Sequence, residues 1–243
     1  MRVPVAIVVT LLAVAAYAPA AVAQSAGPDF DVPNGHFYTQ TNGSQGSGLG
    51  YRISNDGGVA FWSEFQRLGG VTLLGYPASR RFMLDGYVAQ VTQKVILQWR
   101  PDVRQAYFVN TFDKLHDLGL DATLQTTYQI PPQLDASFDV GKTPDQDQAA
   151  RLALLNADPA IAGSYGVGTP GLSLSLLYAG LPTSAVTNEG PFTAVRAQRV
   201  VFQHWTSDGP GGIKAGTLEV VNGGDVAKAV GLVPQSAQAP EPV

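Results

Sequence analysis

The sequence predicts an α+β fold in which two related units each pack helices on a small antiparallel β-sheet. Three observations lead to this prediction. Glycine and proline are frequent, with 27 and 17 residues, and such chains favour short strands and tight turns over long helices. Segments with apolar residues at helical spacing alternate with shorter runs typical of strands. A set of residues that begins at Gly75 also occurs again, in the same order, from Gly180.

Residues 1–23 predict a signal peptide. Arg2 precedes a long apolar run, and the small residues Ala21 and Ala23 complete a cleavage motif. The alternative is an uncleaved anchor, because the run approaches the roughly 20 residues that cross a bilayer. The Ala-Val-Ala site favours cleavage after Ala23. We therefore expect a secreted or cell-surface protein outside the cytoplasm, without a transmembrane segment once the signal is removed.

Charge and cysteine content restrict the possible partners and chemistry. The chain has 15 Lys and Arg against 19 Asp and Glu, and no basic run. Nucleic acid is a poor partner for such a chain, because its binding depends on neutralising phosphates. The absence of cysteine excludes disulfides, thiol catalysis and metal sites built on sulfur. No cofactor is expected.

The first unit is predicted over residues 51–125, after a flexible lead-in at 24–50 that is rich in Gly, Ser and Asn. Asn55 and Asp56 are expected to cap a helix with apolar residues at helical spacing, which ends at Gly69–Gly70. Four further segments follow in chain order: a short apolar run at Val71–Leu74, strands at Tyr87–Gln93 and Val95–Trp99, and a helix at Val109–Leu118.

The second unit is predicted over residues 145–233. A polar, Pro-containing segment at 126–144 is expected to link it to the first unit. Asp145 opens a helix whose acidic first turn suits the helix dipole, and Asp158 starts a further helical turn. Residues 234–243 lack apolar periodicity, which predicts a disordered tail.

The internal repeat is the most informative feature of the sequence. Gly75–Ser79 (GYPAS) is matched by Gly180–Ser184 (GLPTS), and the strand Gln93–Trp99 is matched by Gln198–Trp205. Each copy also ends in a short helical pattern closed by Gly-Leu. So many matches in one order predict a duplication.

Strand alternation predicts which side chains of the repeat share a face. Val95, Leu97 and Trp99 alternate and should point to one side of their strand. In the second copy His204 adds one residue before Trp205. We expect a bulge or the end of the strand to absorb it.

The two units are expected to dock. Each is well under 100 residues, and a chain of that size buries only roughly 60–65% of its surface. Docking would cover the remaining apolar faces, including Val95, Leu97, Val200 and Phe202.

A family resemblance follows from the first copy. Leu73–Pro77, preceded by Gly-Gly and followed by a Gln-rich strand, is similar to the LGFP-type repeats of exported bacterial proteins, with Tyr76 in place of Phe. The longer pattern from Phe61 to Pro101 resembles repeat modules in secreted proteins of Chloroflexota-like bacteria. In the second copy Leu181 departs from the aromatic position. The resemblance implies association with the cell wall, and no catalytic residue transfers with it.

The candidate binding residues are the aromatic, amide and imidazole side chains near the repeated turn and at the strand ends. They are Tyr76, Gln98, Trp99, Gln203, His204 and Trp205. An aromatic face beside amide groups is suited to stacking on a sugar ring. The alternative is core packing, because aromatic side chains bury large areas.

Other patterns lack the context that their chemistry needs. Gly166–Gly171 matches G-x-G-x-x-G, but a helix-like segment precedes it, so we interpret it as a turn. His36, His116 and His204 do not have the spacing of a zinc site. No metal site is expected.

The sequence thus predicts an exported, non-catalytic module that binds a cell-envelope polymer, either a polysaccharide or the cell wall, or an envelope protein. The alternative is a secreted hydrolase acting on such a polymer, with a carboxylate pair such as Glu64 and Asp85, or Glu189 and Asp208. A module with a purely structural or protein-interaction role is a third possibility.

Overall fold

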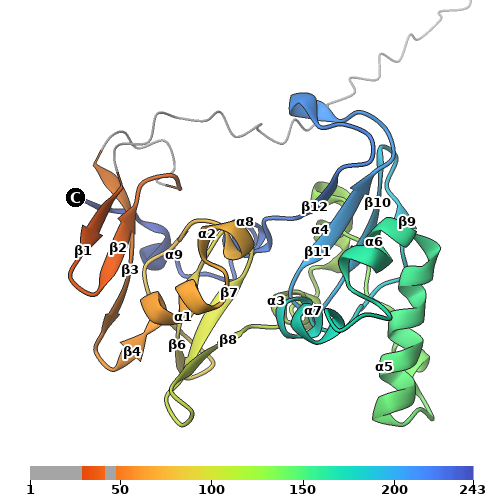
Figure 1. The fold of residues 1–243 in the computed structure, drawn as a ribbon, viewed down its shortest axis with the longest axis horizontal. Helices are drawn as coiled ribbons and strands as arrows, with labels where there is room; N and C mark the ends of the chain where they lie inside the picture. The colour runs from red at the N-terminus through yellow and green to blue at the C-terminus, as the bar shows by residue number, and fades with distance from the viewer. Residues whose placement is uncertain (1–28, 42–47, 243) are drawn as a thin grey trace, which may run out of the picture.

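The structure is a computed structural model that describes residues 29–41 and 48–242. These residues form helices and three small antiparallel sheets, which confirms the mixed helical and β composition of the predicted fold (Figure 1). Within the described part of the chain, no helix is long and apolar enough to cross a membrane. The predicted signal peptide, residues 1–23, lies outside the described residues.

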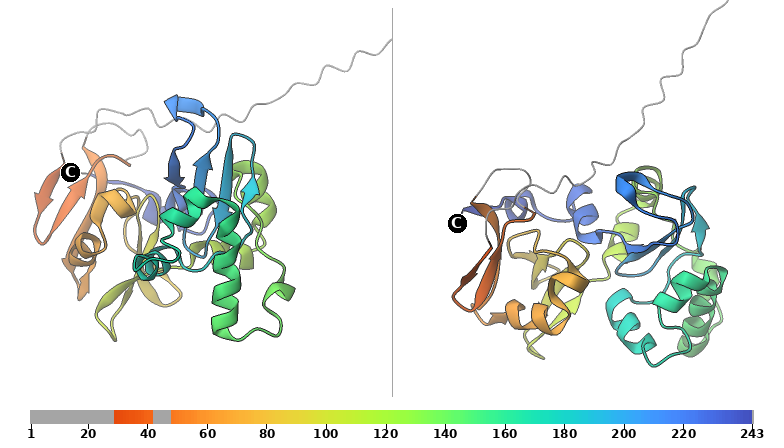
Figure 2. Two further views of the ribbon diagram at one scale, coloured as in Figure 1. Left: turned by 45° about the vertical axis from the view of Figure 1, so that its right-hand side comes forward. Right: turned by 45° about the horizontal axis from the view of Figure 1, so that its top comes forward.

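The N-terminal sheet brings the two ends of the described chain together (Figure 1). Its strands are arranged in the order β1 (Phe30–Val32), β2 (Gly35–Tyr38), β3 (Leu49–Asp56) and β13 (Glu241–Pro242), and β4 (Val59–Ala60) pairs with the end of β3. In the right-hand view of Figure 2 this sheet and the blue sheet near the C-terminus lie on opposite sides of the molecule.

Two predictions about the ends of the chain are wrong where the structure describes them. The lead-in at 24–50 was expected to be flexible, but β1 and β2 form a hairpin in which Asn34 adopts φ 56° and Phe37 is buried. The tail at 234–243 was expected to be disordered, but α9 (Gln235–Gln238) and β13 are ordered there. Ala237 is buried, and the Tyr51 hydroxyl donates to the Gln238 carbonyl at 2.5 Å.

The middle part carries a four-stranded antiparallel sheet with its strands in sequence order. Its elements are α1 (Phe61–Arg67), α2 (Gly70–Leu74), β5 (Phe82–Leu84), β6 (Tyr87–Val91), β7 (Ile96–Arg100), β8 (Gln105–Phe108), α3 (Thr111–Asp117) and α4 (Asp121–Tyr128). The apolar run at 71–74 is therefore helical. The two strands and the helix predicted between residues 87 and 118 are present, with slightly shorter bounds.

The start of the first predicted helix needs correction. Asn55 and Asp56 are the last residues of β3, and the helix begins only at Phe61. Gly57 and Gly58, both at positive φ, turn the chain back into β4 before the helix starts. Left-handed backbone of this kind favours glycine, so these two glycines form a turn after Asp56. Asn55 and Asp56 therefore do not cap the helix.

The third part repeats the order of helices followed by a four-stranded sheet. Its elements are η1 (Ala136–Asp139), α5 (Pro144–Ala153), η2 (Leu154–Ala157), α6 (Pro159–Ser164), α7 (Leu172–Ala179), β9 (Thr187–Asn188), β10 (Phe192–Arg196), β11 (Val201–Trp205), η3 (Pro210–Gly212), β12 (Leu218–Val220) and α8 (Gly223–Ala229). The helices predicted at Asp145 and Asp158 are present, and the Asp158 carboxylate caps α6.

The segment expected as a linker, 126–144, is packed against the protein. α4 extends into it, so the first unit does not end at residue 125. Ile130 is buried, and the Leu134 N–H donates to the Thr183 carbonyl at 2.7 Å.

The turn after α2 is held by a small set of hydrogen bonds. Gly75 has φ 77°, and the Tyr76 N–H donates to the side-chain oxygen of Gln93 at 3.0 Å. The Ser79 hydroxyl accepts from the Val91 N–H at 2.8 Å. These bonds fix the turn on the edge of the β6–β7 hairpin.

The turn after α7 has the same arrangement. Gly180 has φ 76°, and the Leu181 N–H donates to the side-chain oxygen of Gln198 at 3.0 Å. The Ser184 hydroxyl accepts from the Arg196 N–H at 2.9 Å. Each residue stands at the position in its turn that the repeat in the sequence indicates.

The helices that follow the two sheets each pack on the other sheet's turn. The Phe112 N–H at the start of α3 donates to the Gln198 carbonyl at 3.0 Å, and the Gly224 N–H at the start of α8 donates to the Gln93 carbonyl at 2.9 Å. The Asp113 carboxylate also accepts from the Gln198 amide at 3.1 Å. These contacts join the middle and third parts reciprocally.

One hydrophobic core runs through all three parts. It contains Ile53 from the first, Leu97 from the middle and Phe202 from the third. The rings of Phe108 on β8 and Tyr178 on α7 meet edge to face at 5.7 Å between the middle and third parts. The four apolar strand residues expected inside docked units are buried: Val95, Leu97, Val200 and Phe202.

The strand β11 has no bulge before its tryptophan. It pairs with β10 in unbroken register up to Trp205, which lies opposite Phe192. Regular alternation therefore places His204 on the face of Phe202 and Trp205 on the other face. The expected bulge is absent from this pairing, and the strand ends at Trp205. Counted from the turns, His204 occupies the position of Trp99.

Candidate functional site

The six predicted binding residues do not form one site. Gln98 donates to the Leu84 carbonyl at 2.9 Å. Trp99 packs on Phe61, with ring centroids 6.3 Å apart, whereas Trp205 packs on Phe192 at 4.9 Å in a separate cluster. The remaining three, Tyr76, Gln203 and His204, are half-buried at separate places. Only Tyr76 joins a group of partly exposed aromatic rings.

We call this group the aromatic surface. It consists of the half-buried rings of His36, Trp62 and Tyr76 above the buried rings of Tyr38 and Phe65. Ring centroids lie 5.9 Å apart for His36 and Trp62, and 5.6 Å apart for Tyr38 and Tyr76. The His36 and Trp62 rings are nearly parallel, at 15°. Three structural elements, β2, α1 and the first turn, thus present aromatic rings together.

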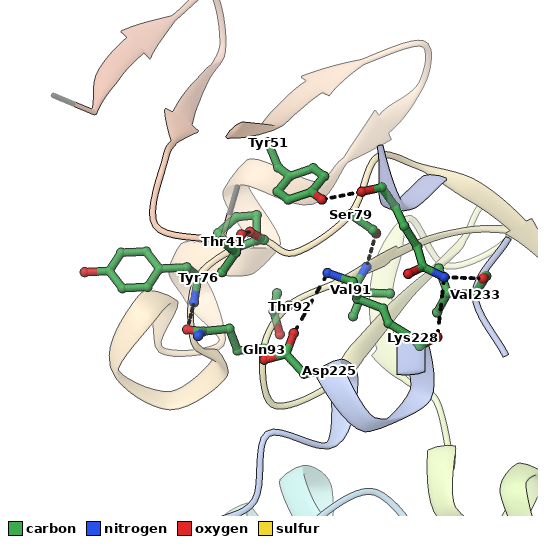
Figure 3. Close-up of polar contacts among 12 residues, drawn as sticks. Thr41, Tyr51, Tyr76, Ser79, Val91, Thr92, Gln93, Asp225, Lys228 and Val233 are labelled. Atoms are coloured by element: carbon green, nitrogen blue, oxygen red, sulfur yellow. Dashed lines mark hydrogen bonds and ion pairs between the residues drawn. The ribbon is translucent and has the colours of Figure 1, made fainter. Parts of the chain in front are cut away.

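Tyr76 is positioned by its turn. A Cβ on Gly75 would lie 2.7 Å from the Gln93 Cβ, so only glycine allows the close approach that brings the Tyr76 N–H to Gln93. Figure 3 shows the Tyr76 ring pointing away from Gln93 and from Asp225. Pro77, which follows Tyr76 in the turn, accepts a hydrogen bond at its carbonyl from the Thr41 hydroxyl.

The aromatic surface has little charge of its own. Burial, and then the nearby Asp29 carboxylate, raise the pKa of Tyr38, so its phenol stays neutral. The His36 Nδ1 lies 2.8 Å from an oxygen of the exposed Asp31 carboxylate. Neutral aromatic faces edged by polar groups suit the apolar faces and hydroxyls of sugar rings.

The second turn does not present a comparable surface. Leu181 takes the place of Tyr76 there and packs half-buried against the main core. The hydroxyl of the neighbouring Tyr165, which is buried, donates to the Gly180 carbonyl. The backbone frame of the turn is thus present without an aromatic group.

His204 forms a polar contact with a helix cap. Its Nδ1 lies 2.8 Å from the Asp158 carboxylate, which also accepts from the backbone of α6 and from the Thr193 hydroxyl at 2.5 Å. Burial alone would raise the pKa of Asp158, but the hydrogen bonds from Thr193 and His204 lower it. His204 therefore has a structural role, because it holds the Asp158 carboxylate that caps α6.

The carboxylates considered for hydrolysis are held in separate contacts. Glu64 accepts from Nε and Nη2 of Arg67, at 2.9 and 2.8 Å, and these bonds lower the pKa of Glu64. Asp85 pairs with Lys114 at 2.5 Å, and Asp208 pairs with Lys214 at 2.7 Å. A general acid needs a raised pKa, so Glu64 does not suit that role.

Glu189 is the fourth of these carboxylates, and burial raises its pKa. Among the described residues, none of the four lines a described cavity.

Metal and nucleotide sites find no support among the residues that the structure describes. No group of three or more His, Cys, Asp or Glu side chains in that part of the chain is arranged to hold a metal ion. Gly166–Gly171 forms a turn between α6 and α7, with positive φ at Gly166 and Gly168. A dinucleotide loop follows a strand, and this one follows a helix.

Sequence reasoning did not include two of the three half-buried rings among the candidate binding residues. His36 lies in the segment that was expected to be flexible, and Trp62 packs against the core. A usable signal was present, because His36 and Tyr38 alternate on one face of a short strand. That strand was overlooked because glycine- and serine-rich sequence surrounds it.

No protein-family model matches the sequence, and no curated protein is significantly similar to it.

Proposed function

We propose that this protein is an exported, non-catalytic module that binds a polysaccharide of the cell envelope through the aromatic surface. The observation that carries the proposal is the gathering of His36, Trp62 and Tyr76, which present partly exposed rings from three elements. Core packing alone does not require three large rings to remain accessible together. The signal sequence at residues 1–23 supports export.

We also propose that the middle and third parts are related units that arose by duplication. The support is the same set of turn hydrogen bonds in both, from Gly75 to Val91 and from Gly180 to Arg196. In this interpretation the first unit binds the ligand together with β2 of the N-terminal sheet. The second unit supports it through the reciprocal packing of α3 and α8. The similarity of Leu73–Pro77 to LGFP-type repeats agrees with attachment to the cell wall.

The test is sedimentation of the mature protein, residues 24–243, with purified cell wall and with insoluble polysaccharides. We expect the protein to pellet with at least one of them. Trp62→Ala should weaken binding about tenfold, because stacking of an aromatic ring contributes roughly 1–1.5 kcal/mol. Failure to pellet with any polymer would refute the proposal.

The matched control is Leu174→Ala. Leu174 is 72% exposed on α7, away from the aromatic surface. Equal losses in both variants would indicate non-specific hydrophobic adsorption and would also contradict the proposal. Thermal melting of each variant checks that it is folded.

A further inference from the structure

A hollow lies beside Trp99 and the residues that lead into α1. Its volume is about 310 Å³, and its lining includes Asn55, Asp56, Trp99 and Arg104 together with the β3–β4 turn. Trp99 is only 5% exposed and forms an apolar wall of this hollow.

Two residues that line the hollow carry side-chain donors that have no partner within the part of the chain that the structure describes. The Trp99 indole N–H has no acceptor there, and the Arg104 guanidinium has no hydrogen bond or ion pair. Trp205 is the contrast, since its indole N–H donates to Glu219 at 3.2 Å. Arg104 is exposed, and its backbone adopts φ 54°.

The side-chain acceptors of the hollow are already occupied. The Asn55 amide oxygen accepts from the Ser63 N–H at 3.1 Å, and the Asn55 amide nitrogen donates to the Ser63 hydroxyl at 2.8 Å. Asp56 is paired with Arg81 at 2.6 Å and also accepts from the Ser54 hydroxyl. The side-chain acceptors of the hollow thus have donors within the protein, whereas the Trp99 and Arg104 donors have no acceptor in the described structure.

The charges lead to the same conclusion. Asp56 is paired with Arg81, whereas the positive charge of Arg104 has no partner in the described structure. A guanidinium and an indole N–H beside an apolar wall suit a ligand that has both a carboxylate and a ring face.

We propose that this hollow binds a sugar residue that carries a carboxylate, such as a uronic acid. The inference rests on the proposed polysaccharide function and specifies its substrate class. The hollow and the aromatic surface share α1: Ser63 contacts Asn55 of the hollow, and its neighbour Trp62 belongs to the aromatic surface. A polymer that crosses α1 would contact both.

The test follows the three tryptophan indole N–H signals by NMR, with Trp99→Phe used to assign that of Trp99. Glucuronate is titrated into the mature protein, with glucose and acetate as controls at equal ionic strength. We expect glucuronate to shift the Trp99 signal, and glucose and acetate to shift it far less. Free monosaccharides avoid any dependence on the linkage of the polymer.

Arg104→Asn removes the charge with a residue that tolerates positive φ. It should weaken glucuronate binding about tenfold, as expected for a charge-assisted hydrogen bond. Arg100→Gln, at a neighbouring arginine that stacks on Tyr87, should not weaken it. An unchanged Trp99 signal, an equal response to acetate or glucose, or unaltered binding by Arg104→Asn would each overturn the inference. Sedimentation tests the polymer-binding function separately.

Discussion

The two four-stranded sheets share one backbone frame and present different side chains from it. In the first, the turn presents Tyr76, and the strand places Trp99 beside a polar hollow. In the second sheet Leu181 and His204 occupy these positions. Leu181 is half-buried against the core, and His204 is bonded to the carboxylate that caps a helix. The comparison indicates that the hydrogen-bonded turn maintains the fold, while the side chains that it presents are free to differ. Under the proposed function, these side chains determine which turn contributes to a binding surface.

The largest effect is expected at a residue that distinguishes the two sheets. Arg196 is fully buried where the first sheet has Val91, and it donates to Asp121 at 2.7 Å and to the Phe112 carbonyl. Arg196→Met should lower the free energy of unfolding by about 3 kcal/mol or more, because Asp121 loses its buried partner. Urea denaturation measures this.

Arg52→Gln, at an exposed arginine, is the control and should change stability by less than about 0.5 kcal/mol. A loss below about 1 kcal/mol for Arg196→Met would contradict the structural role of Arg196.

Replacing the glutamine of the second turn should destabilise the protein more than replacing the glutamine of the first turn. Gln198 bonds both Leu181 and Asp113, whereas Gln93 bonds only the Tyr76 N–H through its side chain among the described residues. Gln198→Leu should therefore cost about 2 kcal/mol and Gln93→Leu about 1 kcal/mol in the free energy of unfolding. Urea denaturation measures both losses. Equal losses of free energy for the two variants would show that the contact of Gln198 with Asp113 does not stabilise the protein.

The polar cap of the second unit should respond to pH. The folded pKa of Asp158 lies below its ordinary value, so its carboxylate stabilises the protein above the unfolded pKa, and this contribution is lost as the pH falls through the folded pKa. Asp158→Asn should cost about 1 kcal/mol at pH 7. The difference in the free energy of unfolding between Asp158→Asn and the wild type should become smaller as the pH is lowered towards 2.5.

Denaturation at these two pH values is the measurement. Asp208→Asn, at an exposed ion pair, should show little difference at either pH. If the free energies of unfolding of Asp158→Asn and the wild type differ by the same amount at both pH values, the charge of Asp158 does not contribute to stability.

The smallest effect is expected from the tryptophans. Trp205→Phe loses the hydrogen bond to Glu219, and Trp99→Phe loses none within the described structure. Beyond the change in packing, Trp205→Phe should therefore cost about 0.5–1 kcal/mol more. Melting curves of both variants test this order.

Local patterns predicted the parts of the fold that local physics determines. The Gly-Pro turns, the strand alternation of Val95 and Leu97 and the helix at Asp145 all depend on neighbouring residues. The first helix was placed too early because Gly57 and Gly58 form a hairpin that overrides the capping pattern. The hairpin of β1 and β2 was missed because its strands are short.

The candidate site depended on contacts that the sequence does not display. Tyr76 was identified from its turn, but His36 and Trp62 are joined to it only through the buried ring of Tyr38, which contacts both Tyr76 and His36. The two tryptophans of the repeat were treated as equivalent. The unbroken strand pairing up to Trp205 shows that they lie on different faces.

Exchanging the distinguishing residues of the two turns tests the central claim most directly. Tyr76→Leu gives the first turn the side chain of the second, and Leu181→Tyr does the reverse, while both keep the glycine and glutamine frame. The account predicts that Tyr76→Leu weakens sedimentation with the bound polymer about tenfold and that Leu181→Tyr leaves it unchanged. Wild-type binding by a folded Tyr76→Leu variant would contradict the assignment of the ligand to the aromatic surface.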